Sequence, residues 1–263
     1  MNQQNKSQKK IKILFLFFLI NTINLSCNCK LKEIKDPMKQ KSQKPGTVII
    51  LNGSSASGKS SIQMKIQELF EKPYIRLGID NLFNDILPDY YGLGEKHPQG
   101  NFLEKDIRYV DKIKVDGHDA IKLIVGPIGQ KVIKGMHQSI KSFAKNGSNV
   151  VVDYILYEKT WFPHLVESLE DLKVYYVGIK YPIETIEKRE EKRSTSPVGH
   201  ARSHYKTVHY YDNYDLVIDN PEDSAEMIAK KIELFISKNP EPEAFKNYSQ
   251  LFENQKIENK LKF

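Results

Sequence analysis

The apolar residues along the chain follow two spacings that alternate from the middle of the sequence to its end. Short runs rich in Val, Ile and Tyr are bounded by polar residues, as expected of strands inside a sheet. Between them, apolar residues recur every three or four positions, which predicts helices. The predicted strands are 47–51, 74–77, 150–153, 172–179 and 215–219, and the predicted helices are 62–70, 127–143, 183–193 and 225–235. The alternation predicts an α/β fold.

The first predicted strand leads into a loop of small residues that ends in Gly58-Lys59-Ser60, where the first helical pattern begins. This G-x-x-x-x-G-K-S pattern, with a strand before and a helix after, predicts a phosphate-binding P-loop. Lys59 is expected to reach the β- and γ-phosphates of a nucleotide, and the Ser60 hydroxyl to bind Mg²⁺. The predicted nucleotide-binding residues are Gly53, Ser54, Ser55, Ala56, Ser57, Gly58, Lys59, Ser60 and Ser61.

Two aspartates lie at the ends of predicted strands. A side chain just past the carboxyl end of a strand in an open α/β sheet points into the crevice where ligands bind. Asp80 is therefore a candidate base for a hydroxyl that attacks a γ-phosphate, with capping of the next helix as the alternative. Asp153 is a candidate Mg²⁺ ligand, directly or through water. His137 and His164 lack the spacing of a metal site and are assigned structural roles.

Residues 84–126 interrupt the regular pattern with a loop-rich insert that contains several tyrosines. Residues 109–115 then alternate between apolar and polar up to Asp116-Gly117, which predicts a hairpin turn. An insert at this place is where substrate-shaping residues are expected, and a small local core is the alternative role for its aromatic side chains.

Residues 183–204 are interpreted as a lid. Arg189 and Arg193 are four positions apart, on one face of the predicted helix. Two guanidinium groups there suit the neutralisation of charge on a transferred phosphoryl group. The alternative is a solvated helix face with Glu–Arg pairs of little energetic value.

The chain has 263 residues and a net charge of +7, enough length for one α/β domain with extensions. Its basicity belongs to the N-terminus: the ten lysines of residues 1–45 against Glu33 and Asp36 give +8, and subtracting this from +7 leaves −1 for residues 46–263. The broad basic surface that usually supports nucleic-acid binding is missing, so no nucleic-acid partner is expected.

The N-terminus resembles an export signal. Lysines precede the apolar run 13–20, which is too short to span a bilayer. Ser26-Cys27 resembles a bacterial lipoprotein processing site, although Asn24 stands where Leu is usual. Export with membrane attachment through Cys27 is the expectation; a cytoplasmic protein translated from Met38 is the alternative. The predicted organisation is a signal-like segment 1–27, a basic linker 28–46, a core domain 47–238 and a polar tail 239–263.

In their order along the chain, these features resemble the chloramphenicol phosphotransferase family of P-loop kinases. The resemblance covers about residues 47–236 and rests on segments 49–60, 78–82, 126–127, 151–153, Arg189 with Arg193, 208–209 and 214–219. It implies a three-layer P-loop fold with a central parallel sheet, as in adenylate kinase. It also implies ATP with Mg²⁺ as phosphoryl donor, a hydroxyl of a small molecule as acceptor, Asp80 as base, and Lys59, Arg189 and Arg193 as further catalytic residues.

The chain departs from the family at two places. Where the family often has Arg-Gly-Asp-Arg in the lid, this chain has Arg193-Ser194-Thr195-Ser196, and where paired aspartates often follow the third strand, it has Asp153-Tyr154. The family name records one antibiotic, and nothing in residues 84–126 transfers that substrate, or a role in antibiotic resistance, to this chain. Two other functions stay open: a zeta-toxin-like kinase of nucleotide-sugars, and a non-catalytic nucleotide-binding module anchored at a membrane.

Overall fold

The computed structural model describes residues 44–83, 107–193 and 197–261. The chain divides into a unit of residues 1–42 and a unit of residues 43–263, and the described residues belong to the second. The signal-like segment, Cys27, Met38, most of the basic linker, residues 84–106 of the insert and Ser194 to Ser196 of the lid lie outside the described residues. None of the helices formed by the described residues has both the length and the apolar character needed to cross a membrane.

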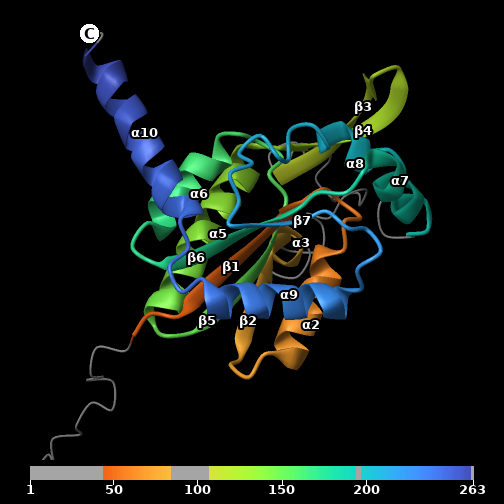
Figure 1. The fold of residues 1–263 in the computed structure, drawn as a ribbon. Helices are drawn as coiled ribbons and strands as arrows, with labels where there is room; N and C mark the ends of the chain where they lie inside the picture. The colour runs from red at the N-terminus through yellow and green to blue at the C-terminus, as the bar shows by residue number, and fades with distance from the viewer. Residues whose placement is uncertain (1–43, 84–106, 194–196, 262–263) are drawn as a thin grey trace, which may run out of the picture. The chain divides into compact units, whose positions relative to one another are not determined.

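A five-stranded parallel sheet forms the centre of the domain (Figure 1). Its strands are β1 (Thr47–Gly53), β2 (Tyr74–Gly78), β5 (Asn149–Tyr154), β6 (Lys173–Ile179) and β7 (Leu216–Ile218), in the order β2-β5-β1-β6-β7. All pairings are parallel, so the carboxyl ends of the strands lie at one edge of the sheet. The predicted strands and the predicted parallel sheet are thus confirmed.

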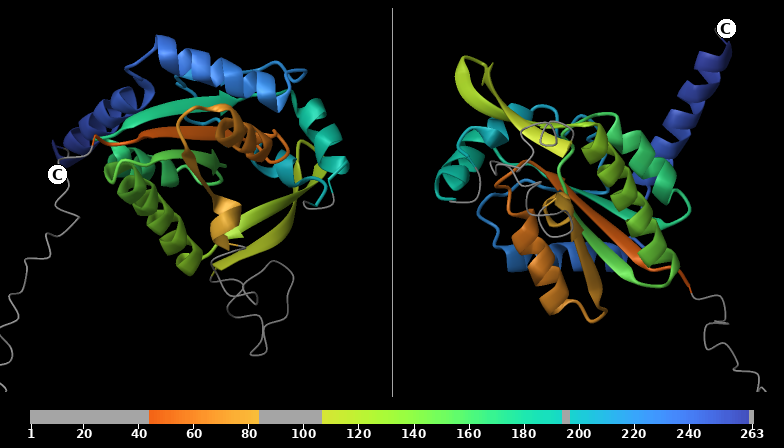
Figure 2. Two further views of the ribbon diagram at one scale, coloured as in Figure 1. Left: turned by 90° about the horizontal axis from the view of Figure 1, so that it is seen from below. Right: turned by 180° about the vertical axis from the view of Figure 1, so that it is seen from behind.

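Helices cover both faces of this sheet. The described helices are α2 (Lys59–Leu69), α3 (Ile79–Asn81), α5 (Pro127–Lys145), α6 (Trp161–Leu169), α7 (Ile183–Glu191), α8 (His200–His204), α9 (Ala225–Lys238) and α10 (Ala244–Leu261). Side chains of a strand point alternately to its two faces. Val48 and Ile50 accordingly pack in the apolar cluster under α5 and α6, whereas Ile49 and Leu51 pack in the cluster under α2 and α9. Figure 2 shows α9 and α5 on opposite sides of the sheet, which gives the three predicted layers.

The second half of the insert forms an antiparallel hairpin of β3 (Arg108–Val115) and β4 (His118–Val125). Its turn consists of Asp116 and Gly117, both with positive φ, as the sequence predicts. Helix α8 packs against β4, where the Ile121 N–H donates to the Gly199 carbonyl over 3.1 Å. The hairpin therefore contacts the lid region of the chain.

The prediction of a polar tail over 239–263 is wrong, because residues 244–261 form the helix α10. Asp215 holds the start of this helix, since its Oδ1 accepts hydrogen bonds from the N–H groups of Glu243 and Ala244. Ala244, Phe245 and Tyr248 are buried in the core cluster next to α6. The spacing of Phe245, Tyr248 and Phe252 is that of one helix face, a signal that the polar composition of the segment obscures.

Candidate active site

The P-loop connects the carboxyl end of the central strand β1 to the first turn of α2. Gly58 has φ +94°, and Ala56 also lies in the left-handed region at φ 60°. A side chain at Gly53 would come within 2.8 Å of the Ile179 carbonyl oxygen, so the loop needs a glycine there. Helix α2 has Gly58 as its N-cap, without a side-chain cap and without an acidic residue in its first turn. Its first N–H groups are thus available to an anion.

Lys59, Ser60 and Asp153 meet beside this loop. The Asp153 carboxylate lies at the end of β5, which pairs directly with β1. Its Oδ1 is 3.4 Å from Lys59 Nζ, and its Oδ2 accepts a hydrogen bond of 2.6 Å from Ser60 Oγ. Lys59 is buried, and its Nζ also donates to the Ser54 carbonyl over 2.8 Å. Burial lowers the pKa of Lys59, although the negative charges of Asp153 and Asp80 act against this.

The Ser60 and Asp153 oxygens are a suitable donor pair for Mg²⁺. Mg²⁺ prefers oxygen ligands, and in P-loop enzymes it is held by one or two protein oxygens together with phosphate oxygens and water. The hydroxyl and the carboxylate already touch, so a cation between them would replace one short hydrogen bond. Among the described residues no group of three or more His, Cys, Asp or Glu side chains could hold a metal. The fit therefore rests on these two oxygens.

Asp80 lies at the next strand of the same edge. It follows β2, which pairs with β5 so that Gly78 is opposite Asp153. Asp80 is partly open to solvent. Desolvation by the surrounding protein, and then the negative charge of Asp153, raise the pKa of Asp80. Lys59, Arg108 and His200 counteract this rise. The N-cap of α3 is Gly78, and Asp80 lies inside the helix. The alternative role of Asp80 as the helix cap is therefore wrong.

Arg189 of α7 lies beside the P-loop. Its Nη1 would be 4.0 Å from a β-carbon built at Gly58. Its guanidinium is 4.8 Å from the centre of the Tyr181 ring, and Nη2 donates to the Pro221 carbonyl over 2.5 Å. An aromatic ring and a main-chain carbonyl thus hold Arg189 at the loop, and its positive charge suits a position next to phosphate.

Arg193 does not share a helix with Arg189, contrary to the prediction, because α7 ends at Glu191. The chain turns back there: the carboxylate of buried Glu190 accepts hydrogen bonds from the N–H groups of Gly199 and Ala201 over 2.8 and 2.7 Å. The side chain of Arg193 is exposed, and its charge is close enough to contribute to the lowered pKa of Lys59. Both arginines therefore belong to the P-loop side of the site.

The glutamates of α7 do not form the intrahelical Glu–Arg pairs of the alternative interpretation. Glu190 binds main-chain N–H groups, and Glu187 forms a two-pronged ion pair with Arg202 of α8, at 2.6 and 2.8 Å. Both glutamates thus connect α7 to α8. They fix the position of α8 over the P-loop.

Helix α8 and the loop after β5 contribute a hydrogen-bonded pair that the sequence reasoning missed. His200 Nδ1–H donates to the Ile121 carbonyl over 3.1 Å, because a carbonyl can only accept. In the neutral ring, Nε2 then accepts the Tyr157 hydroxyl proton over 3.0 Å. Burial, and then the charges of Asp80 and Asp153, raise the pKa of Tyr157, so this hydroxyl keeps its proton. The phenolic oxygen retains lone pairs that can accept a hydrogen bond from a ligand.

Arg108, at the start of β3, is a further charged residue that the sequence reasoning missed. It is buried, and its guanidinium lies over the Phe83 ring at 5.0 Å from the ring centre. Asp80 and Tyr157 both act on it electrostatically and raise its pKa, against the larger lowering by burial. The only sequence signal was its position, immediately before the alternating residues of the predicted hairpin.

The buried side-chain amide of Asn52 connects the P-loop strand β1 to segments further along the chain. Asn52 Nδ2 donates to the Val208 carbonyl over 2.7 Å and to the Tyr214 hydroxyl over 2.8 Å, and its Oδ1 accepts from the Leu156 N–H over 3.3 Å. The segments 208–209 and 214–219, quoted above for the family resemblance, thus meet the P-loop strand here. The same amide binds the Leu156 N–H, and so connects these segments to the loop that carries Tyr157.

His137 and His164 are brought together across α5 and α6, with their Nδ1 atoms 2.8 Å apart. His137 Nε2 is 3.1 Å from the Tyr154 hydroxyl. Burial, and then the neighbouring His164, lower the pKa of His137 to about 3, so the buried ring is neutral. These contacts are those of a hydrogen-bonded pair inside the core.

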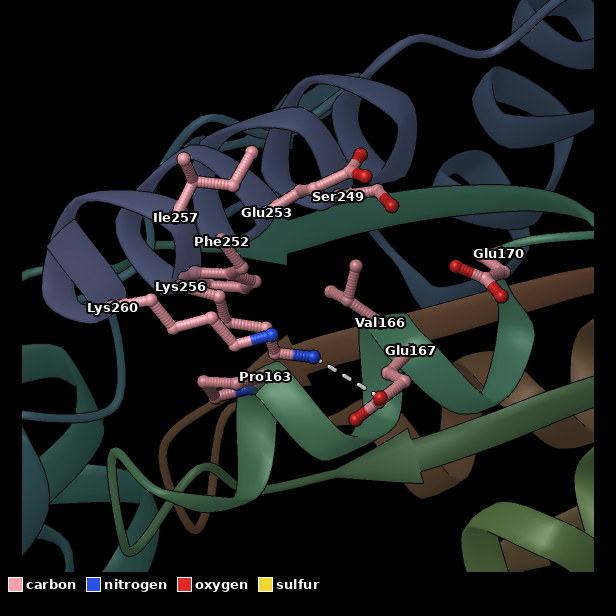
Figure 3. A pocket seen from close by; sticks show the side chains of 10 residues that line it. All are labelled: Pro163, Val166, Glu167, Glu170, Ser249, Phe252, Glu253, Lys256, Ile257 and Lys260. Atoms are coloured by element: carbon pink, nitrogen blue, oxygen red, sulfur yellow. Dashed lines mark hydrogen bonds and ion pairs between the residues drawn. The ribbon is translucent and has the colours of Figure 1, made fainter.

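A separate groove of about 330 Å³ lies between α6 and α10 (Figure 3). It is lined by Val166 and Phe252 and bridged by the ion pair of Lys256 with Glu167, at 3.1 Å. In Figure 1, α10 lies on the opposite side of the view from α7 and α8. No P-loop or lid residue lines this groove, so it is not part of the candidate active site.

A P-loop follows the central strand of a parallel sheet, one carboxylate lies at the end of the neighbouring strand, and another comes just after the strand beyond that. This is the arrangement of a P-loop kinase, a nucleotide-binding phosphotransferase. The sequence agrees with this class. A family model described as "Chloramphenicol phosphotransferase-like protein" matches residues 46–236, and the chain belongs to that family.

Individual relatives are distant. A protein of Mycobacterium tuberculosis (strain H37Rv) named "Putative O-phosphotransferase Rv2636" is 24% identical over 207 residues, which cover 79% of this chain and 89% of that protein. Among solved structures, an unliganded sugar kinase from Janibacter sp. HTCC2649 has a TM-score of 0.50 and 16% identity, covering 73% of this chain and 95% of the other. At this identity the structural likeness shows the fold alone.

Proposed function

We propose that this protein transfers the γ-phosphoryl group of ATP to a hydroxyl of a small molecule, with Asp80 as the general base. The observation that carries the proposal is the meeting of Asp80, Asp153 and the P-loop at one sheet edge. Gly78 of β2 is opposite Asp153 of β5, and Asp80 follows Gly78 in α3. Asp153 contacts both Lys59 and Ser60. A hydroxyl between Asp80 and the P-loop would be deprotonated on one side and face the phosphate on the other.

The P-loop residues would bind and orient the donor. Backbone N–H groups at the start of α2 face the phosphates, and Lys59 exchanges its contact with the Ser54 carbonyl for phosphate oxygens. Mg²⁺, held by Ser60 and Asp153, would offset the negative charge of the phosphate oxygens. Arg189 and Arg193 supply further positive charge from the lid side.

Asp80 would take the hydroxyl proton as the new O–P bond forms. Its raised pKa favours proton acceptance, since a stronger base is a better proton acceptor once it is ionised. Tyr157, His200 and Arg108 line the same region and act electrostatically on Asp80 or on one another. We assign them to the acceptor side of the site.

The test is a screen of the full-length protein with ATP, Mg²⁺ and a panel of alcohols, sugars and nucleotide-sugars, with ADP release as the signal and ³¹P NMR to identify the product. Phosphorylation of a small alcohol or sugar supports the proposal. Phosphorylation of a nucleotide-sugar alone would assign the zeta-toxin-like alternative. A protein that binds ATP but releases no ADP with any acceptor would be the non-catalytic module.

A further inference from the structure

His204 makes a contact with the P-loop that the proposed transfer does not use. The Ser55 N–H donates a hydrogen bond of 3.0 Å to His204 Nε2, across 149 positions of sequence. The ring is 3% exposed. Ser55 is one of the predicted phosphate-binding residues, so an imidazole lies where a phosphate oxygen is expected.

The hydrogen bonds of this ring define its protonation. A backbone N–H can only donate, so Nε2 accepts and Nδ1 carries the proton in the neutral ring. Nδ1 lies 3.4 Å from Ser203 Oγ, whose own proton goes to the His200 carbonyl over 2.7 Å. A phosphate oxygen is likewise an acceptor. The neutral ring and a phosphate therefore compete for the same N–H group.

Packing holds the ring in place. Its centre is 4.8 Å from that of the Tyr157 ring, edge to face, and 4.9 Å from that of the His200 ring. Helix α8 is itself attached to α7 through Glu190. These contacts restrict movement of the imidazole away from the loop when a phosphate binds there. The ring becomes a favourable partner only if Nε2 gains a proton and donates.

Burial and the neighbouring charges disfavour protonation of His204 in the free protein. Burial is the largest cause that lowers the pKa of His204, followed by His200 of α8 and Lys59 of α2, with a smaller contribution from His209. A main-chain contact of His200 acts in the opposite direction. The phenol of Tyr157, the remaining titratable group in ring contact, keeps its proton. The negative charge of ATP would compensate Lys59 and favour the imidazolium form.

We propose that His204 is a nucleotide-binding residue that takes up one proton on Nε2 when ATP binds and then donates it as a hydrogen bond to the phosphate chain. The proton comes from solvent, one N–H bond forms, and the Ser55 N–H is released to the phosphate. The inference rests on the proposed function only in requiring that ATP binds at the P-loop.

The test is isothermal titration calorimetry of the full-length protein with MgATP at pH 7.5, in PIPES and in Tris, whose different ionisation heats report the protons exchanged. Wild type should take up more protons per ATP than His204→Gln, by up to one. Taking the difference between the two proteins removes protons exchanged by the nucleotide itself. The ATP affinity of the wild type should also weaken as pH rises from the pKa of His204 in the free protein to its pKa in the ATP complex, by up to about tenfold per pH unit. The ATP affinity of His204→Gln should not show this dependence.

His118→Gln is the matched control, because His118 is an exposed histidine on the β3–β4 hairpin, and this variant should keep the wild-type proton uptake. Equal uptake by wild type and His204→Gln, or no uptake by wild type, would overturn the inference. If His204→Gln does not fold, which its melting temperature reports, His204→Asn takes its place in the same comparison. Absence of ATP binding in folded wild type would instead refute the proposed function.

Discussion

The phosphate side and the acceptor side of the site are built in different ways. The phosphate side is one continuous segment, Gly53 to Ser61, in which strand, loop and helix follow each other along the chain. The proposed acceptor side collects Asp80, Arg108, Tyr157 and His200 from four separate elements or loops. Local geometry is enough to build the first, whereas the second exists only when the hairpin, the lid and the sheet have packed together. The two sides should therefore respond differently to substitution.

Loss of Lys59 is expected to have the largest effect. Lys59→Ala removes the charge that would bridge the β- and γ-phosphates and leaves the backbone of the loop in place. Transfer should fall by about 10³- to 10⁵-fold, comparable to the loss of a positive charge that stabilises phosphoryl transfer. Steady-state ADP release measures this. The control is Lys65→Ala, which should retain activity because Lys65 pairs with Glu68 within the same helix. Wild-type turnover by Lys59→Ala would refute the assignment of the active site.

Asp80→Asn should separate chemistry from binding. Asn has the size of Asp but cannot take a proton, so kcat should fall by about 10²- to 10⁴-fold. ATP affinity and melting temperature should change little, because Asp80 neither caps α3 nor contacts the P-loop backbone in the described structure. The measurements are kcat, the Kd of ATP and the melting temperature. Asp119→Asn on the exposed hairpin is the control, and an unchanged kcat for Asp80→Asn would remove Asp80 as the base.

Tyr157→Phe should affect the acceptor side alone. The ring contacts with Trp161 and His204 remain, but the hydroxyl that binds His200 is lost. The phenolic oxygen that would accept a hydrogen bond from the acceptor is lost with it. One hydrogen bond is worth about 1–1.5 kcal/mol, so the KM of the acceptor should rise roughly 5- to 12-fold while the Kd of ATP stays the same. Kinetics with the acceptor found by screening would show this, with exposed Tyr210→Phe as the matched control. A selective loss of ATP affinity would place Tyr157 on the phosphate side instead.

The smallest expected change is a shift in pH dependence. Arg108 lowers the pKa of Asp80, so Arg108→Met should raise it further. A base must be ionised to act, and the acid limb of kcat/KM reports the pKa of the base in the free enzyme. This limb should therefore move to higher pH in Arg108→Met and stay closer to wild type in Arg108→Lys, which keeps the charge. Coincident profiles for all three proteins would show that Arg108 does not influence the base.

Helix α10 is an element that local sequence patterns did not predict. Its composition is polar, and Phe245, Tyr248 and Phe252 lie on the face that packs against the core. The helix joins the domain because Asp215, directly before β7, binds N–H groups at its start and because α6 offers an apolar surface on which it packs. A polar segment with few apolar residues becomes a helix when a tertiary partner covers those residues, because packing supplies most helical stability in proteins.

The sequence by itself determined the strands of the sheet, the helices α2, α5, α7 and α9, the P-loop and the positions of the two aspartates, because each depends on residues that are neighbours along the chain or end a strand. Helix α6 was not predicted. The end of α7 before Arg193, and the meeting of Arg108, Tyr157, His200 and His204 around Asp80 and the P-loop, were decided only by the tertiary structure. These contacts join positions up to 149 residues apart, as between Ser55 and His204. Periodicity describes which face of an element is buried but not which distant element it meets, so such contacts arise only from packing.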